Sequence, residues 1–209
     1  VEPGHVHGDA VFGEGRGVRD FLVVTIEHGV GLGIVIDGQI YRGTQGGGAE
    51  FGHIKVHLGG ALCRCGQRGC LEAYVADYAL LREATGTVPN LVGRTPEDKL
   101  DALFAAARTG DQTAGSILER ASRMFAMGLA NLINVFDPAL IIVSGERMSH
   151  DFLYSDDVIA LMRSQVVQVD APPPEVRIHK WGDMMWAKGA AAYAMEGVTE
   201  LAVRRMSDV

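Results

Sequence analysis

The chain has 209 residues, of which 47% are apolar and 22% are charged, and its formal net charge is −7. This composition is typical of a folded globular protein and excludes a disordered or fibrous one. The negative charge argues against a broad nucleic-acid surface on these residues, and no run of about 18 apolar residues suggests a membrane span. With no signal-peptide pattern, the expected location is the cytoplasm.

Strands are predicted in the first part of the chain. Residues 21–26, FLVVTI, are apolar and rich in β-branched side chains, which is typical of a buried strand. Residues 30–43 are predicted to form two strands joined at Asp37-Gly38, because Asp-Gly between apolar runs favours a hairpin. Residues 1–20 show little periodicity and are interpreted as a remnant or junction.

The rest of the chain is predicted to alternate helices with strands. Pro96 suits the first turn of a helix, Asp111 can cap a long one, and Asp137-Pro138 ends it. Helices are expected over residues 72–84, 96–109, 112–136, 151–164 and 183–205, and strands over 139–145 and 176–179. This alternation predicts an α/β fold.

All the cysteines of the chain lie in one short segment, LCRCGQRGCLE, at positions 63, 65 and 70. An odd, tightly clustered set is a poor disulfide framework, whereas three thiolates and a histidine make a common zinc site. Gly66 and Gly69 allow the chain to reverse between the thiolates. The spacing leaves His53 and His57 as alternative fourth ligands, and the other interpretation is that the cysteines are small buried residues.

Residues 50–74, EFGHIKVHLGGALCRCGQRGCLEAY, resemble the signature of the ROK family of repressors, open reading frames and sugar kinases. That signature is E-x-G-H followed by C-x-C-G-x-x-G-C-L-E. The resemblance implies an actin-like ATPase fold of two RNase H-like halves. This chain would be mainly the second half, at 21–182, with an inserted zinc loop at 53–72 and a C-terminal helix at 183–209. The implied zinc ligands are His53, Cys63, Cys65 and Cys70.

The resemblance also implies a sugar site beside the metal. In ROK sugar kinases the matching glutamates and the zinc histidine contact a hexose or an N-acetylhexosamine, which indicates Glu50, His53 and Glu72 here. A carboxylate can accept hydrogen bonds from two neighbouring hydroxyls, and a zinc-bound imidazole keeps its second nitrogen as a donor. The alternative for Glu72 is a first-turn residue that the helix dipole favours.

Two departures from the family pattern argue against a kinase. ROK kinases carry an Asn-Asp pair whose aspartate is the base, but Pro3-Gly4 stands at the expected place, so no catalytic residue is assigned. They also have Gly-Thr-Gly after the first strand, where this chain has Glu27-His28-Gly29, and a carboxylate there repels a triphosphate. Candidate nucleotide contacts remain, with close strand packing as their alternative explanation: Gly29, Gly31 and Gly145.

Two other segments resemble the ROK transcriptional regulators: HKWGDMMWAKGAAAYAM at 179–195 and SGERM at 144–148. The favoured function is therefore the sugar-sensing effector domain of a repressor, with structural zinc, forming a homodimer or higher homo-oligomer. DNA would be bound only through a domain outside these residues. The alternative is an ATP- and Mg²⁺-dependent sugar kinase whose first half is missing from the sequence. A zinc-stabilised scaffold with neither activity is the third possibility.

Overall fold

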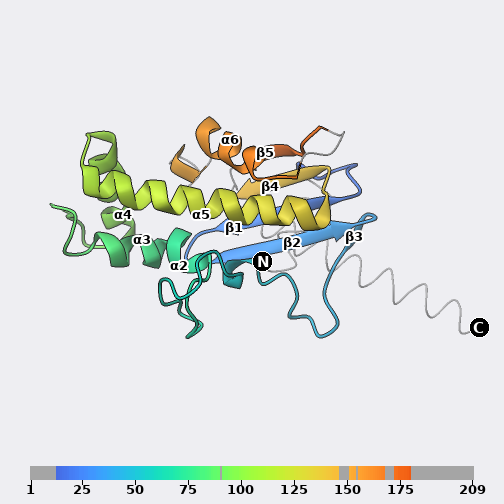
Figure 1. Cartoon of the computed structure of the whole chain (residues 1–209), viewed down its shortest axis with the longest axis horizontal. Coiled ribbons are helices and arrows are strands. Elements are labelled where there is room, and N and C mark those ends of the chain that lie inside the picture. Colours follow the sequence, from blue (N-terminus) through green and yellow to red (C-terminus); the bar gives the residue numbers. More distant parts are fainter. Residues whose placement is uncertain (1–12, 90, 146–150, 154, 168–171, 180–209) are drawn as a thin grey trace, which may run out of the picture.

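The computed structural model describes residues 13–89, 91–145, 151–153, 155–167 and 172–179, and its centre is a five-stranded sheet ordered β3-β2-β1-β4-β5 (Figure 1). Strand β1 pairs antiparallel with β2 and parallel with β4, which in turn pairs parallel with β5. The strands are Phe21–Ile26 (β1), Val30–Ile36 (β2), Gln39–Ile40 (β3), Leu140–Ser144 (β4) and Glu175–His179 (β5). The predicted α/β class is confirmed as a mixed sheet.

The hairpin between β2 and β3 turns at the predicted dipeptide. Asp37 and Gly38 have φ angles of 53° and 75°, which are the left-handed values that a tight two-residue hairpin turn needs at both central positions. The backbone N–H of Asp37 also donates to Asp20 Oδ1 at 2.8 Å. This second contact anchors the turn to the residue that precedes β1.

The helices predicted over 96–109 and 112–136 occur at the expected places. Thr95 forms a capping box with Asp98, and Asp111 accepts a hydrogen bond from the Ala114 N–H at 2.8 Å. No helix in the described ranges is both long and apolar enough to cross a membrane. The helices are Glu72–Val75 (α2), Asp77–Ala84 (α3), Pro96–Arg108 (α4), Gln112–Phe136 (α5) and Asp156–Ser164 (α6), with 3₁₀ turns at Phe51–His53 (η1) and Asp151–Leu153 (η2).

Two helix predictions need correction. The single helix expected over 72–84 is broken at buried Ala76, whose φ of −70° and ψ of 153° are extended, and the Asp77 N–H donates to Glu27 O at 3.1 Å. The helix expected from residue 151 begins at Asp156, after η2. The predicted helix at 183–209 and the junction up to residue 12 lie outside the described residues.

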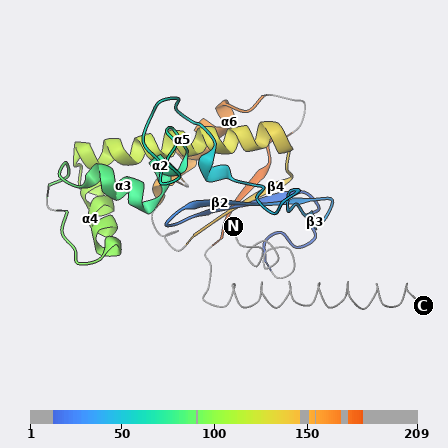
Figure 2. The same ribbon diagram turned by 90° about the horizontal axis from the view of Figure 1, so that it is seen from below.

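Helix α5 runs along one face of the sheet (Figure 2). Leu22, Val24 and Ile26 of β1 point into the core on that face, whereas Phe21 and Val23 belong to a smaller cluster on the other face. Gly128 of α5 allows close approach, because a Cβ there would lie 2.9 Å from the Leu71 side chain and 3.0 Å from the Phe51 ring. The segments at both ends of the cysteine loop are therefore packed directly against α5.

Candidate functional site

The cysteine segment forms a compact loop between η1 and α2. Isolated antiparallel bridges join Lys55 to Cys70 and Leu62 to Arg68. Within the loop, the Cys63 N–H donates to Gln67 O at 2.8 Å, and the Gly69 N–H donates to Ala61 O at 2.9 Å. Because Gly66 and Gly69 have φ angles of 85° and 78°, the predicted reversals do occur at these glycines.

This backbone brings four metal-type donors together. One ligand atom from each of His53, Cys63, Cys65 and Cys70 lies within 4.8 Å of all the others. Cys63 and Cys70 are buried, Cys65 is exposed, and His53 is half-buried. The cluster therefore lies at the edge of the core, with two cysteines buried and one exposed.

The separations fit a tetrahedral ion. With metal–sulfur bonds of about 2.3 Å, two sulfurs on one tetrahedral zinc ion lie about 3.8 Å apart. Cys65 Sγ lies 3.7 Å from Cys70 Sγ, and Cys63 Sγ lies 3.7 Å from His53 Nδ1. A disulfide needs sulfurs about 2.05 Å apart, and all three thiols are free. The donor set and its spacing suit zinc rather than a disulfide.

His57, the other histidine that the spacing left open, has a different partner. Its Nδ1 lies 3.3 Å from the Tyr74 hydroxyl, and the two rings stack with centroids 6.3 Å apart. The Tyr74 oxygen also accepts the Ala61 N–H at 2.8 Å. His57 thus packs against Tyr74 of α2, whereas His53 belongs to the donor cluster.

The thiols have unequal electrostatic surroundings. The Lys55 ammonium donates to Cys70 Sγ at 2.9 Å and to His53 O at 3.1 Å. Burial raises the pKa of Cys63, whereas the backbone N–H of Gln67 lowers the pKa of Cys65. Three thiolates would leave a net charge of −1 on a bound Zn²⁺, and Lys55 lies where it offsets that charge.

The predicted sugar ligands surround the same cluster. Glu50 Oε2 lies 3.8 Å from His53 Nε2, the ring nitrogen that does not face the thiols, and the Glu50 side chain is 68% exposed. Glu72 begins α2, and its Oε1 lies 3.7 Å from Cys63 Sγ while its Oε2 accepts the Val30 N–H at 3.3 Å. Two carboxylates and one imidazole therefore lie together beside the thiols, and their role as sugar ligands stays a prediction.

Sequence reasoning missed Tyr78 and Arg82, which attach α3 to the loop. The Tyr78 hydroxyl lies 3.4 Å from Glu72 Oε1 and 3.6 Å from Cys63 Sγ, and Arg82 donates to Leu62 O at 2.7 Å. Burial, followed by the hydrogen bond to Cys63, raises the pKa of Tyr78, so its phenol keeps its proton. The i, i+4 spacing of the two residues was the available signal, but it did not indicate what they contact.

The candidate nucleotide glycines lie in or next to strands of the central sheet. Gly31 pairs with Thr25 inside the sheet, and the Gly29 carbonyl accepts the Glu27 N–H at 2.9 Å in the β1–β2 turn. Gly145 follows β4, and a Cβ there would lie 2.3 Å from Ile26 O. Close packing against the end of β1 therefore explains Gly145. Gly29 and Gly145 nevertheless lie at the same end of the parallel pair β1–β4.

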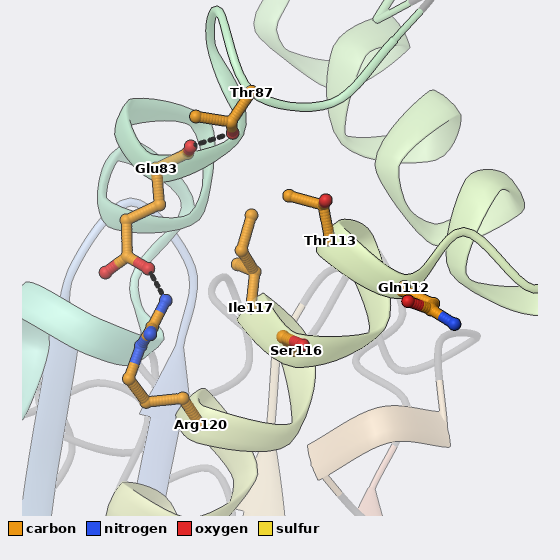
Figure 3. Close-up of a pocket in the computed structure, with 7 residues that line it drawn as sticks. All are labelled: Glu83, Thr87, Gln112, Thr113, Ser116, Ile117 and Arg120. Carbon is orange, nitrogen blue, oxygen red and sulfur yellow. Dashed lines mark hydrogen bonds and ion pairs between the residues drawn. The ribbon is translucent and has the colours of Figure 1, made fainter.

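A separate groove of about 510 Å³ lies between α3 and α5. Glu83 and Arg120 form an ion pair across it, and the hydroxyls of Thr113 and Ser116 lie along its α5 side (Figure 3). Its remaining lining residues are Thr87, Gln112 and Ile117. The predicted metal and sugar residues are not among the described residues that line this groove.

Known proteins of two kinds resemble the chain. The glucokinase of Thermotoga maritima is 37% identical over 148 residues, which cover 67% of this chain and 47% of the glucokinase. The xylose repressor of Bacillus subtilis is 31% identical over 163 residues, which cover 77% of this chain and 39% of the repressor. The chain thus spans about half the length of these relatives or less.

Solved structures lead to the same family. A ROK glucokinase from Streptomyces griseus, crystallised with glucose and AMPPNP, superposes with a TM-score of 0.74 at 32% identity, over 90% of this chain and 64% of the kinase. The ROK family model matches residues 5–196. The mixed sheet is thus that of an actin-like ATPase fold, and the chain belongs to the ROK family.

Proposed function

We propose that the chain is the sugar-sensing part of a ROK transcriptional regulator, in which zinc bound by His53, Cys63, Cys65 and Cys70 orders a sugar site. The observation that carries this proposal is the contact between the two sites. Cys63 Sγ lies 3.7 Å from both His53 Nδ1 and Glu72 Oε1, so a metal-type ligand and a sugar-type carboxylate lie side by side. Bound zinc would stabilise the folded loop, and the folded loop would hold the sugar-binding side chains in position.

The chemistry of the flanking groups suits a polyol. Ionised Glu50 and Glu72 can only accept hydrogen bonds, and each can accept from two adjacent hydroxyls. His53 Nε2 faces away from the thiols toward Glu50, so a metal on Nδ1 leaves Nε2–H as a donor. The related glucokinase with bound glucose and the xylose repressor are consistent with a hexose or a pentose as the ligand, and the family resemblance adds an amino sugar.

A regulator is favoured over a kinase by the turn after β1. His28 Nδ1 lies 3.8 Å from Asp77 Oδ2, and the Asp77 carboxylate is 13% exposed. Together with Glu27, this places two carboxylate-bearing residues beside the turn that would receive phosphates, and they repel a triphosphate. We propose that the chain carries no catalytic base. DNA binding through a further domain and a homodimer or higher oligomer belong to the same proposal.

The sugar kinase is the second candidate, favoured by the similarity to glucokinases. On the full-length protein, calorimetry with D-glucose, D-xylose and N-acetyl-D-mannosamine, followed by a coupled assay for ADP with the same sugars, separates the two functions. We expect one of these sugars to bind the zinc-loaded protein without ADP release. Turnover near the typical enzyme median of about 10 per second would establish the kinase instead. Binding of none of the three sugars would contradict the proposed sensor.

A further inference from the structure

Three polar groups meet where α3 lies against the loop. The Tyr78 hydroxyl is 3.6 Å from Cys63 Sγ and 3.4 Å from Glu72 Oε1, and these two acceptors are 3.7 Å apart. Tyr78 comes from α3, Glu72 from the start of α2 and Cys63 from the loop. One phenol therefore touches a metal-type ligand and a sugar-type ligand at the same time.

Two hydrogen-bond donors lie on the Glu72 carboxylate. The Val30 N–H donates to Oε2 at 3.3 Å, and the Tyr78 hydroxyl lies beside Oε1. A metal-bound cysteine is a thiolate and has no proton to donate, so two anionic groups then face each other. In the part of the chain that the structure describes, the Tyr78 O–H is the donor that remains beside both of them.

The phenol is held so that its single proton points to this pair. The backbone N–H of Arg64 donates to the Tyr78 oxygen at 3.4 Å, which occupies a lone pair and leaves the proton for Cys63 or Glu72. The Arg64 guanidinium lies 3.8 Å from the centroid of the Tyr78 ring, and the Arg82 guanidinium lies 6.0 Å from it. Two positive groups thus lie near the ring, and the closer one, Arg64, packs directly against it.

We infer that Tyr78 is a positioning residue that shares its proton between the Cys63 thiolate and the Glu72 carboxylate. This shared hydrogen bond offsets the repulsion between the two anionic groups when Cys63 binds a metal. The effect on sugar binding rests on the proposed function, whereas the contact with the thiolate does not. Tyr78 acts through Glu72 and need not touch the sugar itself.

The test uses Tyr78→Phe, which removes the hydroxyl and keeps the ring. Zinc content is expected to stay at about one per chain, because all four ligands remain. With Co²⁺ in place of zinc, the thiolate-to-cobalt charge-transfer band is expected at lower energy, because a thiolate without its hydrogen-bond donor gives up charge more easily. Tyr74→Phe is the matched control, since that hydroxyl contacts Ala61 and His57 and should leave the band unchanged.

Calorimetry with the sugar that binds most tightly among D-glucose, D-xylose and N-acetyl-D-mannosamine gives the second readout. Tyr78→Phe is expected to weaken binding several-fold, and in a Glu72→Gln background the same change should have little further effect. Full additivity of the two substitutions would overturn the inference. An unchanged cobalt band in Tyr78→Phe would overturn it too, even if none of the sugars binds and the proposed function itself fails.

Discussion

Cys65→Ala is expected to lose the bound zinc and to lower the free energy of unfolding by several kcal/mol. Structural zinc sites have apparent binding free energies of about 10–16 kcal/mol near neutral pH, and much of this is folding free energy. Cys65 is the informative choice because it is exposed, unlike Cys63 and Cys70, so its truncation leaves no core cavity. The measurements are zinc content by mass spectrometry after dialysis and the midpoint of thermal unfolding.

The control for this substitution is His57→Ala. His57 stacks on Tyr74 and does not belong to the donor cluster, so the variant should keep its zinc even if the loop is weakened. Full zinc occupancy in Cys65→Ala would rule out the proposed ligand set. If His57→Ala lost zinc and a His53→Ala variant kept it, the fourth ligand would be His57 and not His53.

Gly69→Ala is expected to destabilise the loop far more than Gly66→Ala. Both glycines have left-handed φ angles, 78° and 85°, so either alanine costs about 1–2 kcal/mol in backbone strain. At Gly69 a Cβ would also lie 1.9 Å from the His57 carbonyl oxygen, whereas at Gly66 nothing lies within 4 Å. The backbone must move at Gly69, and a loss above about 4 kcal/mol is expected there.

Denaturant unfolding of the two zinc-loaded variants measures this difference. Gly66→Ala is the matched control, because it has the same backbone strain without the steric overlap. Gly69→Ala should also release zinc to a competing chelator at a lower chelator concentration. Equal stability of the two variants would mean that the chain does not pass His57 as closely as described.

The sheet could be predicted because its signals are local. The apolar run at 21–26 predicts strand β1, and Asp37-Gly38 predicts the turn between β2 and β3, each from residues that are close in sequence. The break at Ala76 could not be predicted, because alanine has the highest helix propensity and the break comes from a tertiary contact, the hydrogen bond from Asp77 N to Glu27 O. Tertiary structure overrides propensity at this position.

The same distinction holds for the site. The thiols meet because they are close in sequence and separated by glycines, and this was visible in the spacing. His53 joins the thiols and His57 does not, because the His57 ring contacts the Tyr74 hydroxyl instead. Tyr78 could not be found from the sequence, because its contacts with Cys63 and Glu72 join α3 to a loop and to another helix. The spacing predicted a cluster of thiols near a histidine, the choice of His53 came from the family resemblance, and Tyr78 was not predicted.

Sugar affinity in Glu72→Gln, measured by calorimetry together with zinc content, tests the central claim most directly. Glu83→Gln is the control, because this carboxylate lies in the groove between α3 and α5, paired with Arg120. Removing a charge-assisted hydrogen bond costs about 1.5–3 kcal/mol, which is a loss in affinity of about tenfold or more. We expect this loss in Glu72→Gln with full zinc, and unchanged affinity in Glu83→Gln. Unchanged affinity in Glu72→Gln would contradict the claim that the metal loop presents this carboxylate to a sugar.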